Sequence, residues 1–237
     1  MSNKIKYRLK FIKSGNVRFI GHLDLMSLFN MAIKRAKLPI AYSEGFNPHQ
    51  LLSFALPLSL GYHSNGEYLD MVLAEPRDCK EIVNLLNGNI PDGVKITAAG
   101  RMPKDSKNSA SIVNSCAYKV ILPEGHGISD AIANEFITQT QIVITKKTKK
   151  NLADVDIAPD IFEFITKASC EMVEEIYMRI SAGPNRSVRA DSVVKALFAF
   201  AGAVYPEHGL IFARDEMYSD TKGERPLLVI GEHGEQV

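Results

Sequence analysis

The start of the chain alternates between basic and apolar side chains. From position 4 to position 11 every second residue is apolar, and the residues between them are Lys4, Lys6, Arg8 and Lys10. A period of two is typical of a β-strand with one buried face, because successive side chains of a strand point to opposite sides. We therefore predict a strand over residues 4–11 with one apolar face and one basic face.

A helical period follows this strand. From His22 to Lys37 apolar residues recur every three or four positions, which predicts an amphipathic helix, and Pro39 ends it. The same reasoning predicts the other elements of the first half: short strand 40–42, turn 45–48, strands 51–58 and 67–73, helix 77–86, and strand 94–98.

This order of elements indicates the fold class. Apart from the short strand, the first hundred residues read β-α-β-β-α-β, which is the ferredoxin-like order. Residues 101–114 are polar and without periodicity, so we interpret them as a linker. The second half, residues 115–218, is expected to repeat the order between a strand at 117–122 and a strand at 209–214. The prediction is an α+β protein: a tandem pair of ferredoxin-like units with antiparallel sheets, units 1–100 and 115–218, and a C-terminal tail, 219–237.

Composition excludes several classes of protein. The 237 residues include 28 basic and 27 acidic side chains, so the chain is not a globally polyanion-binding protein of the histone kind. Its three cysteines, Cys79, Cys116 and Cys170, are too scattered for a disulfide framework or a zinc knuckle. The sequence shows neither a signal peptide nor an apolar run of about 18 residues. We expect a cytoplasmic protein with no membrane association, no cofactor and no metal.

Polar residues interrupt the apolar block between positions 17 and 73, and two histidines there are candidates for chemistry. His22, at the expected helix start, and His49 could act as general bases, and Glu44 is the third catalytic candidate. The alternative is that His22 caps the helix. The turn that contains Glu44, Phe46, Asn47 and His49 is stiffened by Pro48, so we predict that it forms a recognition loop. Packing of Phe46 within the turn is the alternative.

Basic residues are the candidates for binding RNA or another anion. From position 1 to position 23 there are six Lys or Arg residues and no Asp or Glu. A second basic group precedes the last long helix, where free backbone amides could seat a phosphate. The predicted contacts are Lys4, Lys6, Arg8, Lys10, Arg18, Arg186 and Arg189. The lysine run at 146–150 adds to this footprint, although solvated strand and loop faces would explain the same pattern.

The block also resembles a known family. The residues that carry the resemblance are RFIGHLDLM (18–26), Leu38-Pro39, YSEGFNPH (42–49), SFA (53–55) and GEYLD (66–70). They are similar to the radical-SAM-associated domain of unknown function, which occurs in bacteria as a free-standing protein or fused to the C-terminal end of a radical-SAM protein. Gln50 departs from the proline expected there. Ala158 and Asp160 stand where the family usually has an arginine and an aromatic residue. The resemblance implies a radical-SAM protein as partner.

Three functions remain open from the sequence. The first is an accessory protein, not itself an enzyme, that presents RNA or a modified-RNA substrate to a separate radical-SAM enzyme; three scattered cysteines cannot hold that enzyme's cluster. The second is a metal-independent endoribonuclease that uses His22 and His49. The third is a protein-interaction scaffold for the radical-SAM partner.

Overall fold

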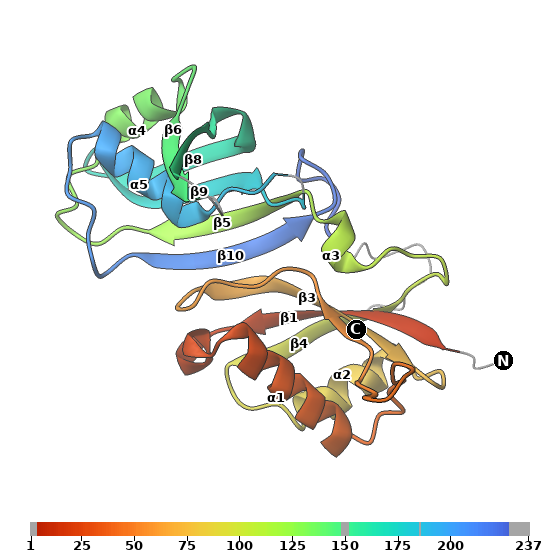
Figure 1. Ribbon diagram of the computed structural model, residues 1–237. Helices are drawn as coiled ribbons and strands as arrows, with labels where there is room; N and C mark the ends of the chain where they lie inside the picture. The colour runs from red at the N-terminus through yellow and green to blue at the C-terminus, as the bar shows by residue number, and fades with distance from the viewer. Residues whose placement is uncertain (1–3, 148–151, 185, 228–237) are drawn as a thin grey trace. The chain divides into compact units, whose positions relative to one another are not determined.

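The chain folds as an α+β protein with antiparallel sheets. A computed structural model describes residues 4–147, 152–184 and 186–227. The chain divides into two compact units (Figure 1). Unit 1 is residues 1–113 together with 225–237, and unit 2 is residues 114–224. No helix of the described residues is long and apolar enough to cross a membrane.

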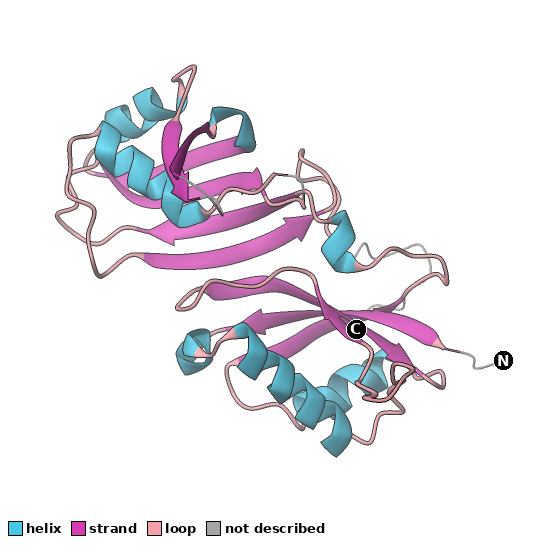
Figure 2. Ribbon diagram, viewed as in Figure 1, coloured by secondary structure: helices cyan, strands magenta, loops and turns pink. Residues whose placement is uncertain are grey.

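Unit 1 is a four-stranded sheet with two long helices. Its elements are β1 (Ile5–Lys13), the 3₁₀ turn η1 (Gly15–Phe19), α1 (His22–Arg35), β2 (Leu52–Phe54), β3 (His63–Leu73), α2 (Cys79–Asn87), β4 (Val94–Arg101) and the short α3 (Ser109–Ile112). The sheet order is β4-β1-β3-β2, and each neighbouring pair is antiparallel. Helices α1 and α2 lie on one face of this sheet (Figure 2).

The core of unit 1 fills the space between this face and the helices. The inward residues of β1, from Ile5 to Phe11, pack with Phe29 and Ile33 of α1 and with Ile82 of α2. Two side chains fix the ends of α2. Asp78 accepts a hydrogen bond from the Glu81 amide at 3.0 Å, which caps the helix start, and Asn87 bonds both backbone groups of Ile96 on β4.

The pairing of β1 with β3 decides which side chains share a face. Arg8 is paired with Asp70 on the face opposite the helices. A bulge after Phe11 then brings Lys13 opposite Ser64. On its other side Lys13 pairs with Val94, a core residue, so Lys13 lies on the helix-covered face.

Unit 2 has a similar order of elements with one insertion. Its elements are β5 (Ser115–Ile121), α4 (Asp130–Ile137), β6 (Val143–Lys147), β7 (Leu152–Asp156), η2 (Ala158–Asp160), β8 (Ile161–Ser169), β9 (Met172–Ser181), α5 (Ala190–Phe200) and β10 (Ile211–Tyr218). The antiparallel sheet runs β10-β5-β9-β8, and β6 pairs with β7 as a separate hairpin. Strand β7 was not predicted from the sequence. The lysine run enters this hairpin, and its positions 148–150 lie outside the described residues.

Residues 101–113 differ from the linker that the sequence predicts. They belong to unit 1, where α3 packs against β2 and β3. Residues 225–227, expected to be part of a C-terminal tail, belong to unit 1 as well. The chain therefore returns to its first unit after completing the second.

Candidate functional site

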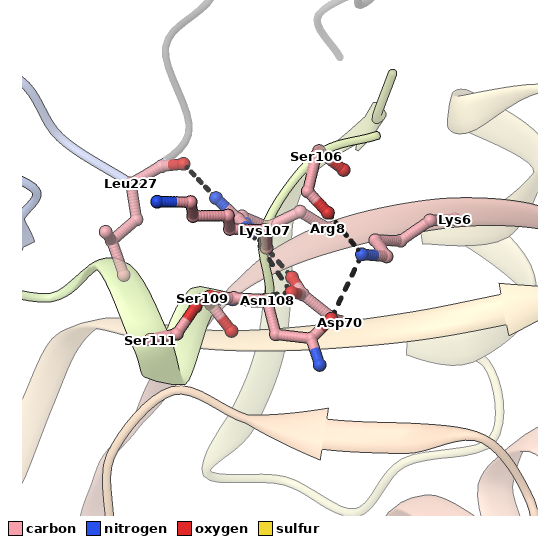
Figure 3. A network of polar contacts seen from close by, with 9 residues as sticks. All are labelled: Lys6, Arg8, Asp70, Ser106, Lys107, Asn108, Ser109, Ser111 and Leu227. Carbon is pink, nitrogen blue, oxygen red and sulfur yellow. Dashed lines mark hydrogen bonds and ion pairs between the residues drawn. The ribbon is translucent and has the colours of Figure 1, made fainter. Parts of the chain in front are cut away.

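Arg8, predicted to bind RNA, is buried in unit 1, with 1% of its surface exposed. Its Nε and Nη2 atoms donate to the two carboxylate oxygens of Asp70, at 2.7 and 3.1 Å (Figure 3). Nη1 donates to the carbonyl of Leu227 and Nη2 to the carbonyl of Lys107. A phosphate would have to break these bonds to reach the guanidinium, so Arg8 serves to hold unit 1 together.

The segment from Met102 to Val113, which we call the strap, lies across the sheet face opposite the helices. The Met102 amide donates to the Lys6 carbonyl, and the Ser109 amide donates to Asp70 Oδ2 at 2.7 Å. Lys6 Nζ donates to the Ser106 carbonyl and to Asn108 Oδ1 (Figure 3). Two of the four basic contacts predicted between positions 4 and 10, Lys6 and Arg8, are thus used to fasten the strap.

The remaining two predicted contacts at the start of the chain are Lys4, which precedes β1, and Lys10. Lys4 is exposed, and its Nζ lies 3.9 Å from Glu44 Oε1. Lys10 is half-buried, with Nζ 5.9 Å from the centre of the Tyr68 ring. A pair as exposed as Lys4 and Glu44 contributes little to stability in water.

Residues 42–50 contain the four predicted recognition residues, and we call this segment the recognition loop after that prediction; it has a braced conformation. Ser43 Oγ lies 2.8 Å from His49 Nδ1 and accepts the His49 amide at 3.0 Å, and the Ser43 amide donates to the His49 carbonyl. These contacts close the loop at its base. At its tip Phe46 is fully exposed, and the Glu44 side chain is 96% exposed. The structure therefore removes the alternative in which Phe46 packs within the turn.

Gln50 anchors the loop to α1. It is one of the residues that depart from the pattern of the resembled family, and it is 7% exposed. Its Nε2 donates to the Asn30 carbonyl at 3.3 Å. The recognition loop is thus attached to the middle of α1.

His22 and His49 occupy different places on unit 1. His22 is the first residue of α1, where its ring meets Phe54 edge to face at 5.4 Å. His49 precedes Gln50, which contacts Asn30, eight residues further along the helix. Eight residues of α-helix rise about 12 Å. Among the described residues each imidazole has its own neighbour, Phe54 for His22 and Ser43 for His49, and no contact joins the two rings.

The predicted anion contacts of unit 2 are paired with carboxylates. Arg186 donates to the buried Asp160 at 2.6 Å, and Arg189 forms two hydrogen bonds with Asp191. Asp160 stands where the resembled family usually has an aromatic residue. Lys146 of the β6–β7 hairpin donates to the Ser187 carbonyl, so the hairpin lies beside the segment that carries both arginines.

A buried polar cluster at the end of the unit 1 core was not predicted. It consists of Lys13, Ser64 and Glu67, each at most 3% exposed. Lys13 Nζ donates to the Ile20 carbonyl at 2.9 Å, and Ser64 Oγ donates to Glu67 Oε1 at 2.7 Å. Burial lowers the pKa of Lys13 below its ordinary value, and the charge of Glu67 opposes that shift. The alternation of β1 could have predicted the burial of Lys13, because Lys13 is two residues after Phe11 and four after Leu9, which both face the core.

Arg18 and His63 form a second unpredicted pair next to this cluster. Arg18 Nη1 lies 2.7 Å from His63 Nε2, and the guanidinium carbon lies 4.6 Å from the centre of the Phe19 ring. Burial lowers the pKa of His63, and the charge of Arg18 lowers it further. A guanidinium only donates hydrogen bonds, so His63 Nε2 accepts and His63 is neutral. Arg18 was a predicted anion contact, whereas His63 was not singled out.

No group of three potential metal ligands occurs among the described residues. His22, His49 and His63 each have a different neighbour: Phe54, Ser43 and Arg18.

Comparison with known proteins gives a family and no activity. A search of curated proteins finds no match. The family model described as "Uncharacterized protein conserved in bacteria (DUF2344)" matches residues 6–190, which include the recognition loop, Arg18 and the Arg8–Asp70 pair. The match covers more than half of the chain. The chain therefore belongs to this uncharacterised family of conserved bacterial proteins.

Proposed function

We propose that the chain is a non-catalytic binding protein that docks onto a partner protein through the recognition loop. The observation that carries the proposal is the full exposure of Phe46 at the tip of a loop that three contacts close at its base. A solvent-exposed phenyl ring on a rigid loop loses little conformational entropy when a partner buries it. Aromatic side chains of this kind are frequent anchors of protein interfaces.

The chemistry of the loop indicates the surface that it fits. Phe46 requires an apolar pocket, and the exposed Glu44 carboxylate favours a basic residue at the rim of that pocket. The sequence resemblance makes a radical-SAM protein the first partner to test. The separation of His22 from His49 supports a binding role over an endoribonuclease.

The test is a calorimetric titration of the chain with the radical-SAM protein of the same organism. Phe46→Ala should weaken binding by about 30-fold, which corresponds to a hot spot of about 2 kcal/mol. It should leave the free energy of unfolding unchanged, because the ring contributes no buried surface. Val204→Ala, which removes a side chain exposed on unit 2, is the matched control. Equal affinities of the wild type and Phe46→Ala would contradict the proposal.

Presentation of RNA is the second candidate function. It is favoured by the contact that brings Lys146 to the segment carrying Arg186 and Arg189. Asp160 and Asp191 partly neutralise this group, so we expect weak binding with few phosphate contacts. Lys146→Gln combined with Arg189→Gln should reduce the salt dependence of binding to labelled RNA. Arg186 is left intact because its removal would leave the buried Asp160 without an ion pair.

We also infer that both units are ferredoxin-like. The support is their element order together with the sheet orders β4-β1-β3-β2 and β10-β5-β9-β8. In each unit the first strand is central and its long-range partner is the third main strand, as in the split βαβ arrangement.

A further inference from the structure

Arg18 is held rigidly by its surroundings. Its carbonyl accepts the Gly61 amide at 2.9 Å, its guanidinium stacks on Phe19, and its Nη1 meets His63. These contacts come from η1, from the loop after β2 and from the start of β3. The guanidinium is therefore fixed before any ligand arrives.

The Nε atom of Arg18 has no partner among the described residues, although it is buried. An arginine Nε always carries a proton, and a buried donor of a charged group is costly to leave without an acceptor. By contrast, the Nε atoms of Arg8 and Arg186 each donate to a carboxylate. Arg18 thus lacks the acceptor that comparable arginines of this chain possess.

The missing acceptor has a defined geometry. Because Nη1 is occupied by His63, the free edge of the guanidinium is the one formed by Nε and Nη2. This edge presents two parallel N–H groups, which match two oxygens of a phosphate or a carboxylate. Among the described residues no ion pair joins Arg18 to a carboxylate.

An exposed aromatic ring lies against the Arg18 guanidinium, whose carbon is 4.6 Å from the centre of the Phe19 ring. Phe19 is 57% exposed and Leu60 is 65% exposed. A Cβ atom added at Gly61, the residue after Leu60, would lie 3.9 Å from the Phe19 ring. The ligand that fits both features is an oxyanion attached to an apolar or aromatic group.

We propose that Arg18, positioned by His63, binds the oxyanion of a small organic phosphate or carboxylate whose apolar part rests on Phe19. The site is independent of the recognition loop. A ligand here would satisfy the Nε donor and cover apolar surface that is otherwise in contact with water.

The experiment is a calorimetric titration of the full chain with three probes: inorganic phosphate, adenosine monophosphate and benzoate. At least one probe should bind, and Arg18→Gln should weaken that binding about tenfold or more. Arg35→Gln, which changes an exposed arginine at the end of α1, is the matched control and should bind as the wild type does. The preferred probe identifies the oxyanion, and Phe19→Ala should remove the advantage of the aromatic probes over inorganic phosphate.

Two results would overturn the proposal: no binding of any probe at about 10 mM, or equal binding by the wild type and Arg18→Gln. If Arg18→Gln lowers the melting temperature strongly, Arg18→Lys replaces it. Lysine keeps the positive charge but cannot donate two parallel hydrogen bonds. The proposal then requires that Arg18→Lys, while folded, binds the probe more weakly than the wild type. Failure of this experiment would leave docking through Phe46 untouched, because the two tests use different residues and ligands.

Discussion

At the scale of single residues, burial separates cations that hold the fold from cations that can meet a ligand. Arg8 and Arg18 both belong to the basic start of the chain, and the sequence assigned them the same role. Arg8 has a carboxylate and two carbonyls as partners, whereas Arg18 has an imidazole and a buried Nε without an acceptor. Only the second arrangement leaves a donor for an anion.

The ion pair between Arg8 and Asp70 gives a prediction at this scale. Asp70→Asn removes the charge that balances a buried guanidinium, so unit 1 should lose about 3–5 kcal/mol of unfolding free energy. Urea unfolding followed through NMR signals of unit 1 residues measures this loss.

The exposed pair of Lys4 and Glu44 is the control for Asp70→Asn. Glu44→Gln should cost less than about 1 kcal/mol, because both partners are in contact with water. Similar losses for Asp70→Asn and Glu44→Gln would mean that burial does not set the strength of the Arg8–Asp70 pair.

At the scale of elements, the strap changes the meaning of the basic strand. A sheet with one face covered by helices and one face bare is a common platform for single-stranded RNA. In unit 1 the strap lies on that second face and is attached to it at Lys6, Arg8 and Asp70 (Figure 3). Basic residues of β1 therefore bind the strap of the same unit.

Hydrogen exchange tests the attachment of the strap. The amides of Met102 and Ser109 donate within unit 1, so they should exchange more slowly than the amide of Lys104, an exposed strap residue. Asp70→Ala should release the Ser109 amide selectively, because Met102 bonds to a backbone carbonyl that the substitution leaves in place. Equally fast exchange of Ser109 and Lys104 in the wild type would show that the strap is not fastened in solution.

At the scale of the whole molecule, the chain completes unit 1 only after it has built unit 2. Residues 225–227 belong to unit 1, and Leu227 contributes a side chain that is 4% exposed and a carbonyl that accepts from Arg8. Sequence proximity would assign this segment to the second unit or to a tail. The tertiary structure makes it part of the first.

Truncation tests this return of the chain. A chain that ends at Glu224 loses the buried Leu227 side chain, which should destabilise unit 1 by about 1.5–3 kcal/mol. A chain that ends at Leu227 keeps both contacts and should retain the stability of unit 1. The measurement is the unfolding free energy from unit 1 signals, and signals from unit 2 serve as the internal reference. The same loss in both truncated chains would exclude the proposed part played by Leu227.

The sequence by itself determined the elements whose side chains carry a period. The alternation of β1, the helical stripe of α1 and the turn chemistry of residues 45–48 are local properties, and all three appear where they were predicted. The sequence left open whether Phe46 packs within that turn, and its full exposure came from the tertiary structure. The same alternation places Lys13 on the buried face of β1.

Only the tertiary structure decided which of these residues meet. The strap and Leu227 are fastened largely through backbone carbonyls, which every residue possesses, so no side-chain pattern could reveal them. The register of β1 with β3 pairs Arg8 with Asp70, 62 positions apart. The Arg18–His63 pair depends on the path of the loop after β2. Local periodicity fixes elements, whereas long-range register and backbone acceptors determine whether a cation holds the fold or is free to bind.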